Sequence, residues 1–429
     1  MDQAKFNNLF PGLGQQEAIA ILSRPIAELE DVSDRYLAAS HLINFPGPVT
    51  TAALMACAAD QDPAQAQRIA RRKAVESLAR LDAREALGVI AACLGEEDIY
   101  LVETASWALA ALACNDPAVH RQLIALLADP RQIRRVIIQA LARLGVRDAI
   151  PAIAALRDDD DGMVAMAAIT ATARLAGDRA GLHQLQDYLL HPDVTLRRAV
   201  IQDLMDGEVV EAADAISSTP VSPVFRLRGA RHLAELQRDA LRADPAASRL
   251  LLQRFDRLLR DHPDDLTLVH AYDRPPDLAF LVRELYGTDF GRSYLAISTL
   301  ERQHGVAALP ALTASFADEG WNDYGAHYHL IHLFGRLGDA AVLPLVRQAL
   351  DNQRPQFQKS RPAAALALAR LEGVEAIPAL NAAVTEDGSW ELRYAALMAL
   401  DQLGKAAPAM VLETEDWLVR LRATAAPLA

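Results

Sequence analysis

A repeated pattern of apolar residues constrains the fold of this chain more than any other feature of its sequence. Four similar segments end on leucines at nearly equal intervals, namely Leu81, Leu112, Leu144 and Leu175. The pattern returns at slightly longer intervals at Leu300, Leu337, Leu371 and Leu403. An interval of roughly 30 residues is typical of solenoids, in which each repeat supplies one small structural unit.

Each repeat has the pattern of a helical hairpin. The apolar segment before each of these leucines predicts one amphipathic helix, and a second apolar segment such as 149–156 follows after a turn. Prolines stand near the start of the second helices, where a missing N–H costs little; these are Pro151, Pro310, Pro344 and Pro378. A single hairpin cannot bury its apolar face, so successive hairpins must stack. We expect an all-α, right-handed α-solenoid of HEAT-like (Armadillo-like) repeats.

The repeats and the segments between them predict four parts of the chain. Residues 1–66 are expected to form an N-terminal helical cap, in which Ser33 caps a helix that begins at Asp34. The first repeat array is predicted at 67–206 and the second at 296–429. Between them, prolines break the period in an irregular helical middle at 207–295.

Composition supports an all-helical protein and disfavours a nucleic-acid partner. Hydrophobic residues make up 52% of the chain and aromatic residues only 5%, because alanine and leucine, both strong helix formers, dominate. The formal charge of −13 has the wrong sign for binding phosphate backbones.

The cysteines and the lack of apolar segments suggest a soluble protein of a reducing compartment. Cys57, Cys93 and Cys114 form no CxxC pair, which disfavours disulfides and structural zinc. The start Met1–Phe6 has no leader pattern, and no apolar run is long enough for a membrane span. We expect a cytoplasmic protein without membrane insertion.

A polar and aromatic cluster stands at the start of one late repeat. Asp323 and His327 are four positions apart, as are Tyr324 and Tyr328, so each pair would share one face of a helix. A carboxylate beside an imidazole is suited to proton transfer near neutral pH. The alternative is that Asp323 caps the helix and His327 packs with a satisfied hydrogen bond.

Arginines and aromatic residues of the first array suggest a ligand surface. Arg72, Arg135 and Arg198 recur at an interval of two repeats and could grip carboxylates, or they could tie neighbouring repeats together. Trp107, one turn beyond Glu103, could stack on a flat ligand or belong to the core.

The middle segment gathers further polar residues without the spacing of metal ligands. His270, Tyr272 and Asp273 could line a polar pocket. The chain has no Walker loop, nucleophile elbow or dinucleotide fingerprint. It also lacks any His-Glu dipeptide, which argues against the di-iron hydroxylases built on HEAT repeats. We therefore predict no metal site.

Several longer strings, together with the repeats, resemble one known family. The strings are 34–42, 224–229, 288–292, 322–329 and 355–361. They are similar to the cyanobacterial bilin lyases of the E/F clan, and in particular to the single-chain phycoerythrobilin lyases and lyase-isomerases of phycoerythrin α-subunits. The resemblance covers nearly the whole chain, including the irregular middle.

The resemblance implies an enzyme that joins a bilin to a protein. Phycoerythrobilin would be the substrate, with no tightly bound cofactor, and a cysteine of an apo-phycoerythrin α-subunit would form the thioether. Some members of the family also isomerise the bilin to phycourobilin, so the resemblance leaves open whether the double bond moves. It also leaves open whether a second lyase subunit is needed. The alternative is a non-catalytic repeat scaffold or chaperone for the subunit.

The resemblance also assigns roles to the candidate residues. Asp323 and His327 would transfer protons, with Tyr324 as a hydrogen-bonding acid. Cations for the two bilin propionates would come from Arg72, Arg226 or Arg228. The remaining residues predicted to contact the substrate are Tyr100, Glu103, Trp107, His270, Tyr272, Asp273 and Tyr328.

Overall fold

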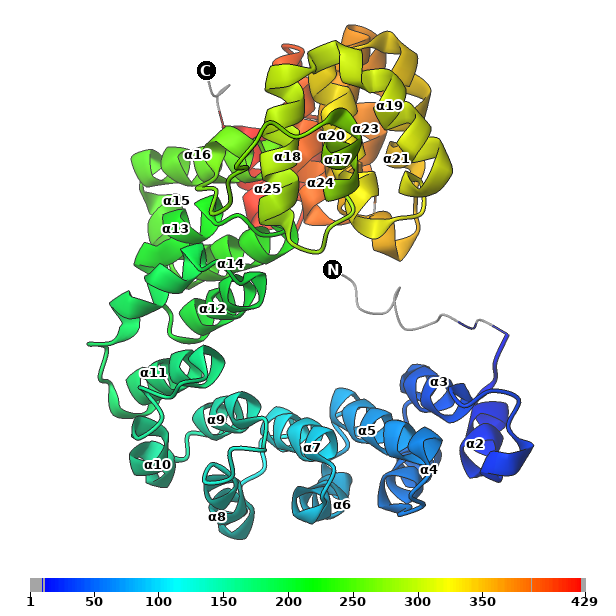
Figure 1. The fold of residues 1–429 in the computed structure, drawn as a ribbon, viewed down its shortest axis with the longest axis vertical. Coiled ribbons are helices and arrows are strands. Elements are labelled where there is room, and N and C mark those ends of the chain that lie inside the picture. The colour runs from blue at the N-terminus through cyan, green and yellow to red at the C-terminus, as the bar shows by residue number, and fades with distance from the viewer. Residues whose placement is uncertain (1–9, 11, 387, 426–429) are drawn as a thin grey trace. The chain divides into compact units, whose positions relative to one another are not determined.

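The computed structural model describes residues 10, 12–386 and 388–425, and all regular structure in these ranges is helical, without a β-strand. Two compact units are present, residues 2–182 and 183–429, termed here the N-terminal unit and the C-terminal unit. Figure 1 shows the helices of each unit. The start Met1–Phe6, with its predicted lack of a leader, lies outside the described residues. The domain bounds at residues 66, 206 and 295 stay predictions.

The N-terminal unit consists of short helices joined by tight turns. Its α-helices are α2 (Gln15–Ser23), α3 (Asp34–His41), α4 (Pro48–Ala59), α5 (Gln65–Arg80), α6 (Leu87–Ala92), α7 (Ile99–Ala111), α8 (Pro117–Leu126), α9 (Arg134–Arg143), α10 (Ile150–Ala154) and α11 (Gly162–Ala176). The first helices of successive repeats, α5, α7, α9 and α11, pack side by side in chain order.

The C-terminal unit repeats this arrangement with longer connections. Its α-helices are α12 (Val194–Asp206), α13 (Ala213–Ser218), α14 (Pro223–Leu236), α15 (Arg238–Ala243), α16 (Pro245–Arg260), α17 (Leu278–Glu284), α18 (Phe290–Gln303), α19 (Leu309–Ser315), α20 (Tyr324–Leu337), α21 (Leu343–Asp351), α22 (Ser360–Glu372), α23 (Ile377–Thr385), α24 (Trp390–Gln402) and α25 (Trp417–Thr424). Here α18, α20, α22 and α24 are the neighbours that pack in order.

The predicted architecture of stacked helical hairpins is confirmed. Most of the residues predicted to mark the starts of helices also stand there. Pro151, Pro310, Pro344 and Pro378 all stand in the first turns of their helices, as predicted. The predicted cap at Ser33 is wrong in detail. Ser33 precedes α3, but its hydroxyl donates to Asp31 Oδ1 at 2.6 Å instead of accepting from the helix.

An ion pair between sequence positions i and i+25 joins neighbouring repeats in both units. It recurs as Arg71–Glu96, Arg134–Asp159, Arg347–Glu372 and Arg361–Glu386. The last of these is bidentate, with Nη1–Oε1 and Nη2–Oε2 distances of 2.9 and 2.6 Å. A planar guanidinium fits a carboxylate in this way, so the pair holds the two hairpins together in a preferred orientation.

Each unit has its own apolar core, formed where the inner faces of its hairpins meet. Alanines line many of the helix contacts, which lets the helices approach closely. Gly335 of α20 is the closest approach: a Cβ there would lie 2.4 Å from the Cβ of Ala367 in α22. Among the described residues, no helix is both long and apolar enough to cross a bilayer.

Candidate functional site

The first helices of the C-terminal repeats begin at one edge of the unit, where charged side chains gather. Asp289, Asp323 and Lys359 stand just before the neighbouring helices α18, α20 and α22. The two carboxylates are N-caps that accept backbone N–H bonds of their own helices at 2.7–2.8 Å. Negative charge is favoured at this end of a helix. The edge therefore holds charged groups from three successive repeats.

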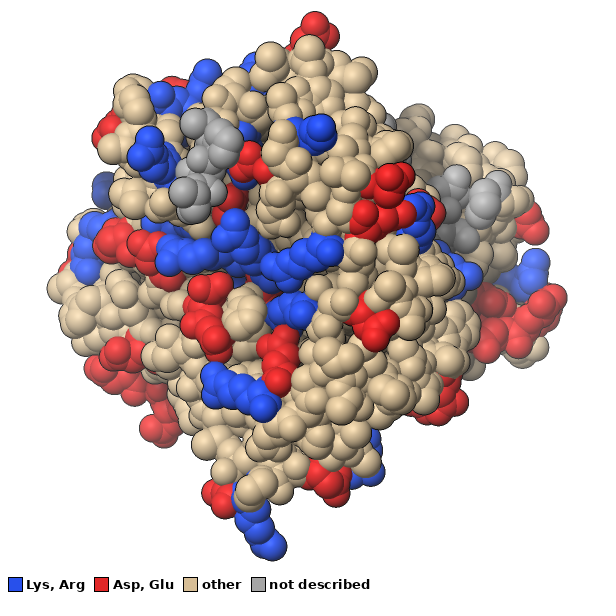
Figure 2. Space-filling view, turned by 90° about the horizontal axis from the view of Figure 1, so that it is seen from above, with Lys and Arg blue, Asp and Glu red and all other residues tan. Residues whose placement is uncertain are grey.

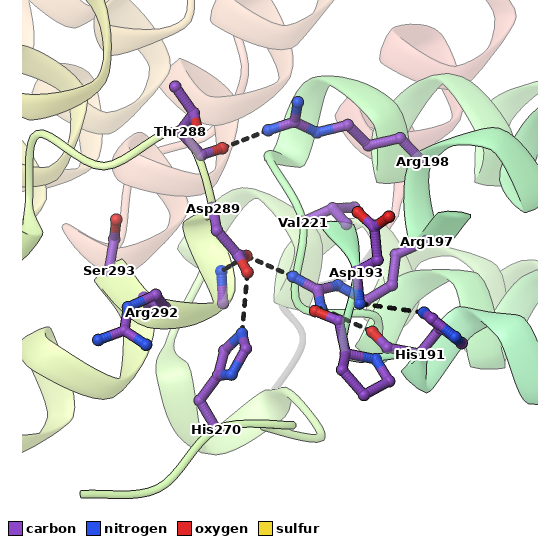
Figure 3. A network of polar contacts seen from close by, with 12 residues as sticks. His191, Asp193, Arg197, Arg198, Val221, His270, Thr288, Asp289, Arg292 and Ser293 are labelled. Atoms are coloured by element: carbon purple, nitrogen blue, oxygen red, sulfur yellow. Dashed lines mark hydrogen bonds and ion pairs between the residues drawn. The ribbon is translucent and has the colours of Figure 1, made fainter. Parts of the chain in front are cut away.

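The carboxylate of Asp289 also joins an imidazole and an arginine, as Figure 3 shows. His270 Nε2 lies 2.8 Å from Asp289 Oδ2, and Arg197 forms an ion pair with Oδ1. Burial alone would raise the pKa of Asp289, but the hydrogen bonds from Arg197 and His270 outweigh it and lower this pKa. An imidazole held by a carboxylate is suited to proton transfer near neutral pH.

Sequence reasoning selected His270 but did not connect it with Asp289. The two residues are separated by a loop and by α17, so no helical spacing relates them. The string 288–292 that carries the family resemblance was the signal that marked Asp289. Next to this pair, Arg198 of α12 donates to the carbonyl oxygen of Thr288, which ties α12 to the start of α18.

Lys359 is a second group at this edge that sequence reasoning did not select, although it lies in the string 355–361. Its Nζ is buried and finds no hydrogen-bond acceptor among the described residues. The nitrogen lies 3.3 Å from the ring centroid of Tyr324, 4.8 Å from that of Phe290 and 5.3 Å from that of Tyr328. These three rings are termed the aromatic cage. Burial lowers the pKa of Lys359 to about 7, although nearby carboxylates oppose the shift.

The structure does not pair the side chains of Asp323 and His327, and a role of either residue in proton transfer stays a prediction. Asp323 caps α20, as the alternative interpretation had it, and its side chain bonds the backbone of the first turn. His327 is 3% exposed, and its Nδ1 lies 2.9 Å from Ser360 Oγ. Asp323 is partly exposed, and the Tyr324 side chain is 49% exposed, so these two residues remain accessible at the edge.

We expect the C-terminal unit to lose stability as the pH falls from about 6.5 to about 4, because of three buried histidines. Burial lowers the pKa of His327 to about 4, that of His332 to about 3, and that of His329 well below its ordinary value. Below pH 6.5 the unfolded chain binds protons that the folded chain does not. The free energy of unfolding therefore falls with pH, by roughly 1.4 kcal/mol per pH unit for each histidine. Urea denaturation across this range measures the slope.

His329 offers a matched variant for this test. Neither of its ring nitrogens has a hydrogen-bond partner among the described residues, and its ring centroid lies 4.4 Å from that of Phe290. His329→Phe should keep the packing and reduce the slope by about one proton. His232 is exposed, so His232→Gln should leave the slope unchanged. An unaltered slope in His329→Phe would contradict the prediction.

Two predicted substrate contacts, Arg226 and Tyr328, are core residues instead, and this corrects the prediction. Arg226 is 1% exposed, pairs with Asp261 and donates to Tyr294 Oη at 2.8 Å. The hydroxyl of Tyr328 donates to Asp261 Oδ2 at 2.5 Å. A charged network of this kind stays buried only because its members satisfy one another. Neither side chain is free to meet a bilin there.

A second polar cluster lies at the start of α7 in the N-terminal unit. Arg72 donates to both oxygens of Asp98 at 2.7 Å, and its Cζ lies 4.8 Å from the ring centroid of Tyr100. Tyr100 is 53% exposed. Burial raises the pKa of Glu103, which Arg72 partly offsets. Trp107 is partly buried and packs against the core.

Arg72 and Arg135 also act as ties between neighbouring repeats, the alternative proposed for the arginine series. Arg135 Nη1 donates to the carbonyl oxygen of Met163 at 3.0 Å in the next repeat.

The remaining predicted residues lie in two other places of the C-terminal unit. Arg228 is exposed and donates to Gln202 at 2.6 Å. Asp273 is exposed, whereas Tyr272 is partly buried against Phe280 at a centroid distance of 5.8 Å. Their contribution to binding stays a prediction.

A cavity of about 580 Å³ in the C-terminal unit lies at the opposite ends of α18 and α20 and contains none of the predicted residues. It is lined by His262, Asp264, Ser298, Glu301, Arg302, Gly305, Val306, Arg336, Leu337 and Arg370. Its arginines are partly neutralised, since Arg336 and Arg302 pair with Glu301 and Asp264.

Basic side chains bordered by acidic ones also form a band on the face in Figure 2. Within the described ranges, no cluster of histidine, cysteine, aspartate and glutamate is arranged to hold a metal ion.

The repeats of the fold define the class of this protein. A family model described as HEAT repeats matches residues 121–205 and 322–401, which include α9 to α11 and α20 to α23. The protein is thus a HEAT-repeat protein.

Similarity to individual proteins then defines the family. Phycocyanin operon protein Y of Pseudanabaena tenuis is 42% identical over 410 residues, covering 96% of this chain and 97% of that protein. Bilin biosynthesis protein CpeY of Synechococcus sp. is 35% identical over 387 residues, 87% of this chain and 90% of the relative. Phycocyanobilin lyase subunit alpha of Nostoc sp. is 28% identical over 245 residues, 54% of this chain and 87% of the relative. The chain belongs to the phycobilin lyase family of the E/F clan, which confirms the resemblance.

Proposed function

We propose that this protein is a phycobilin lyase that attaches phycoerythrobilin through a thioether to a cysteine of a phycoerythrin α-subunit, with concomitant isomerisation to phycourobilin. Family membership supports the reaction class, and two relatives are named for bilin biosynthesis and phycocyanobilin attachment. The observation that carries the proposal is the edge of the C-terminal unit. There an exposed tyrosine ring lies over a buried lysine, beside a carboxylate and near an aspartate-bound histidine.

The proposed reaction makes modest chemical demands that such an edge can meet. The acceptor thiolate is the nucleophile and adds to the ring A ethylidene of the bilin, while an acid protonates the neighbouring carbon. Isomerisation moves the C4=C5 double bond to C2=C3, so that C2 and C3 each lose a proton while C4 and C5 each gain one. The protein supplies position and proton transfer, with the bilin as substrate and no tightly bound cofactor.

Two arginines remain as proposed partners for the bilin propionates. Arg228 is exposed, and its hydrogen bond among the described residues is to the side-chain amide of Gln202, so a carboxylate has room to pair with it. Arg72 is already bidentate to Asp98, so a propionate would have to compete there. The half-exposed ring of Tyr100 and the exposed ring of Tyr324 offer flat apolar faces for pyrrole stacking.

Reconstitution with purified components tests the function. Phycoerythrobilin and an apo-phycoerythrin α-subunit are mixed with and without a small amount of the protein, and covalent attachment is followed as colour that survives denaturation. We expect the protein to accelerate attachment at substoichiometric amounts. The absorption spectrum then separates phycoerythrobilin from phycourobilin, whose conjugated system is shorter.

The controls separate the alternatives. A non-catalytic scaffold or chaperone would increase attachment only in proportion to its own amount. Repeating the assay with apo-phycocyanin subunits tests the choice of acceptor, and adding a partner lyase chain tests whether one polypeptide is sufficient. No acceleration under any of these conditions would overturn the proposal.

Asp323 is the proposed negative group beside the reacting end of the bilin, and Asp323→Asn should slow attachment at least about tenfold. Asparagine also caps helices well, so the fold should be preserved while the charge is lost. Asp116 is an exposed N-cap of α8, and Asp116→Asn is the matched control that should leave the rate unchanged. If attachment rate and product colour are both unaltered in Asp323→Asn, Asp323 has no part in the reaction.

A further inference from the structure

Lys359 is a basic group whose surroundings differ from those of the arginine ion pairs. The chain has only four lysines, Lys5, Lys73, Lys359 and Lys405, among its 43 basic residues. Arginine forms the structural ties between repeats. A guanidinium holds its proton permanently, whereas a buried ammonium can release it. Among the described side chains of this edge, Lys359 is therefore the one cationic group, apart from histidine, that is able to release a proton near neutral pH.

The aromatic cage buries this ammonium beneath one exposed ring and offers it no hydrogen-bond acceptor among the described residues. Phe290 and Tyr328 are buried and form the floor, while Tyr324 is 49% exposed and lies over Nζ at 3.3 Å. Rotation of this one exposed ring would uncover the nitrogen, because the other two rings are held in the core. A flat pyrrole ring that takes the place of Tyr324 would then lie against the ammonium and retain the cation–π contact.

The charged and titratable groups around Lys359 come from three helices, α20, α16 and α12. From the start of α20 come Asp323 and Tyr324, and Asp261 at the end of α16 is the second carboxylate that favours the ammonium. Arg198 of α12 opposes it. The imidazoles of His327 and His329 are neutral near pH 7, because burial and then Lys359 lower their pKa values. Burial raises the pKa of Tyr324, so that its hydroxyl keeps its proton. Lys359 is thus the group of this set best suited to donate a proton.

We propose that Lys359 is the proton donor of the attachment reaction and that the Tyr324 ring is a movable cover over it. This inference rests on the proposed function and adds the identity of the acid. In the step, the acceptor thiolate forms the C–S bond at the ethylidene carbon. The electron pair of that double bond moves to the adjacent ring carbon, which takes a proton from the Lys359 ammonium. The resulting amine regains a proton from water, and the proton lost earlier by the thiol also goes to water.

Titration of Lys359 tests the inference without any substrate. The intact protein is labelled with a trace of an amine-reactive reagent at a series of pH values, and each lysine is followed by mass spectrometry. We expect the half-point for Lys359 to lie near neutral pH, and the exposed Lys405 is followed in the same samples for comparison. Tyr324→Ala should label Lys359 faster and move its half-point upward, because the nitrogen becomes hydrated. A half-point for Lys359 equal to that of Lys405 would overturn the inference.

The pH profile of attachment then tests the catalytic role. The wild-type rate should fall above neutral pH as the ammonium is lost. Lys359→Met should slow attachment at least about 100-fold, and its remaining rate should no longer fall above neutral pH. Lys359→Arg keeps the charge without a transferable proton, so bilin binding should persist while attachment remains slow. Lys405→Met is the exposed control with unchanged rate.

The outcomes separate this inference from the proposed function. If the wild type does not accelerate attachment, the function fails whatever Lys359 does. If the wild type is active and Lys359→Arg keeps the full rate, then Lys359 only attracts the bilin and the proton-donor role is overturned. A purely structural lysine would lower thermal stability when replaced. We instead expect Lys359→Met to be at least as stable as the wild type, since it removes a buried, unpaired charge.

Discussion

Replacing Asp261 with alanine should lower the free energy of unfolding of the C-terminal unit by about 3–5 kcal/mol. The carboxylate pairs with Arg226 and accepts from the hydroxyls of Tyr294 and Tyr328 at 2.8 and 2.5 Å, all in the interior. Without it, the guanidinium stays buried with no counter-charge and two hydroxyls lose their acceptor. Urea denaturation measures the change.

Two further variants separate charge from backbone conformation. Asp261 has φ +47°, in the left-handed region that asparagine adopts at lower cost than alanine does. Asp261→Asn therefore removes only the charge. The double variant with Arg226→Met should recover much of the loss, because both charges are gone. If Asp261→Asn alone is as stable as the wild type, the ion pair contributes nothing.

The same network adds a pH dependence at lower pH than the histidines do. Burial would raise the pKa of Asp261, but the attraction of Arg226 and hydrogen bonds lower it to about 2. Because the folded-state pKa is below the ordinary one, this stabilisation is fully present above about pH 4 and is lost as the pH falls toward about 2. Asp261→Asn should lack this component.

Tryptophan fluorescence can report on the C-terminal unit alone. Three of the four tryptophans, Trp321, Trp390 and Trp417, belong to that unit, and Trp107 belongs to the other. The stability variants are therefore best compared in a Trp107→Phe background.

Gly335→Ala should destabilise the C-terminal unit by about 1–3 kcal/mol, although alanine is normally the better helix former. Its Cβ would lie 2.4 Å from the Cβ and 2.9 Å from the Cα of Ala367, so α20 and α22 would have to separate. Tyr324 belongs to α20 and Lys359 directly precedes α22, so attachment activity should fall as well. Stability is measured by denaturation and activity by the reconstitution assay.

The reciprocal exchange provides the control for this variant. Ala367→Gly in the Gly335→Ala background moves the methyl group from one helix to the other and should restore most of the stability and activity. At another glycine the same substitution should have the opposite effect on stability. Gly88 of α6 is exposed, and an added methyl group there would meet only open space. Gly88→Ala should therefore be neutral or stabilising by up to ~1 kcal/mol.

Most of the fold could be predicted from the sequence because a helical hairpin is a local structure. The leucine period and the proline positions predicted α5, α7, α9 and α11 and their later counterparts, since each signal and the helix it predicts lie within one repeat. The details at helix ends were less predictable. Ser33 and Asp34 both had suitable side chains, and the choice between competing partners there depends on the exact turn.

The site was only partly predictable because its contacts cross between repeats. The pairing of Asp323 with His327 assumed that positions i and i+4 share a helical face, but Asp323 is the N-cap, with ψ 127°, so the rule does not apply to it. Lys359 reaches Tyr324 from the following repeat, and neither hydropathy nor spacing encodes this contact. The burial of a single charged residue such as Arg226 could not be predicted from the sequence either, because only the fold brings Asp261 into contact with it.

The arginine–carboxylate pairs between successive repeats have a mechanical consequence. Each one links a hairpin to the next hairpin along the chain, so a bending strain applied to either unit is shared between its two pairs. Small angular adjustments at both pairs would add up to a change in curvature while each pair remains intact. The curvature of a stack joined in this way can change without unfolding any helix.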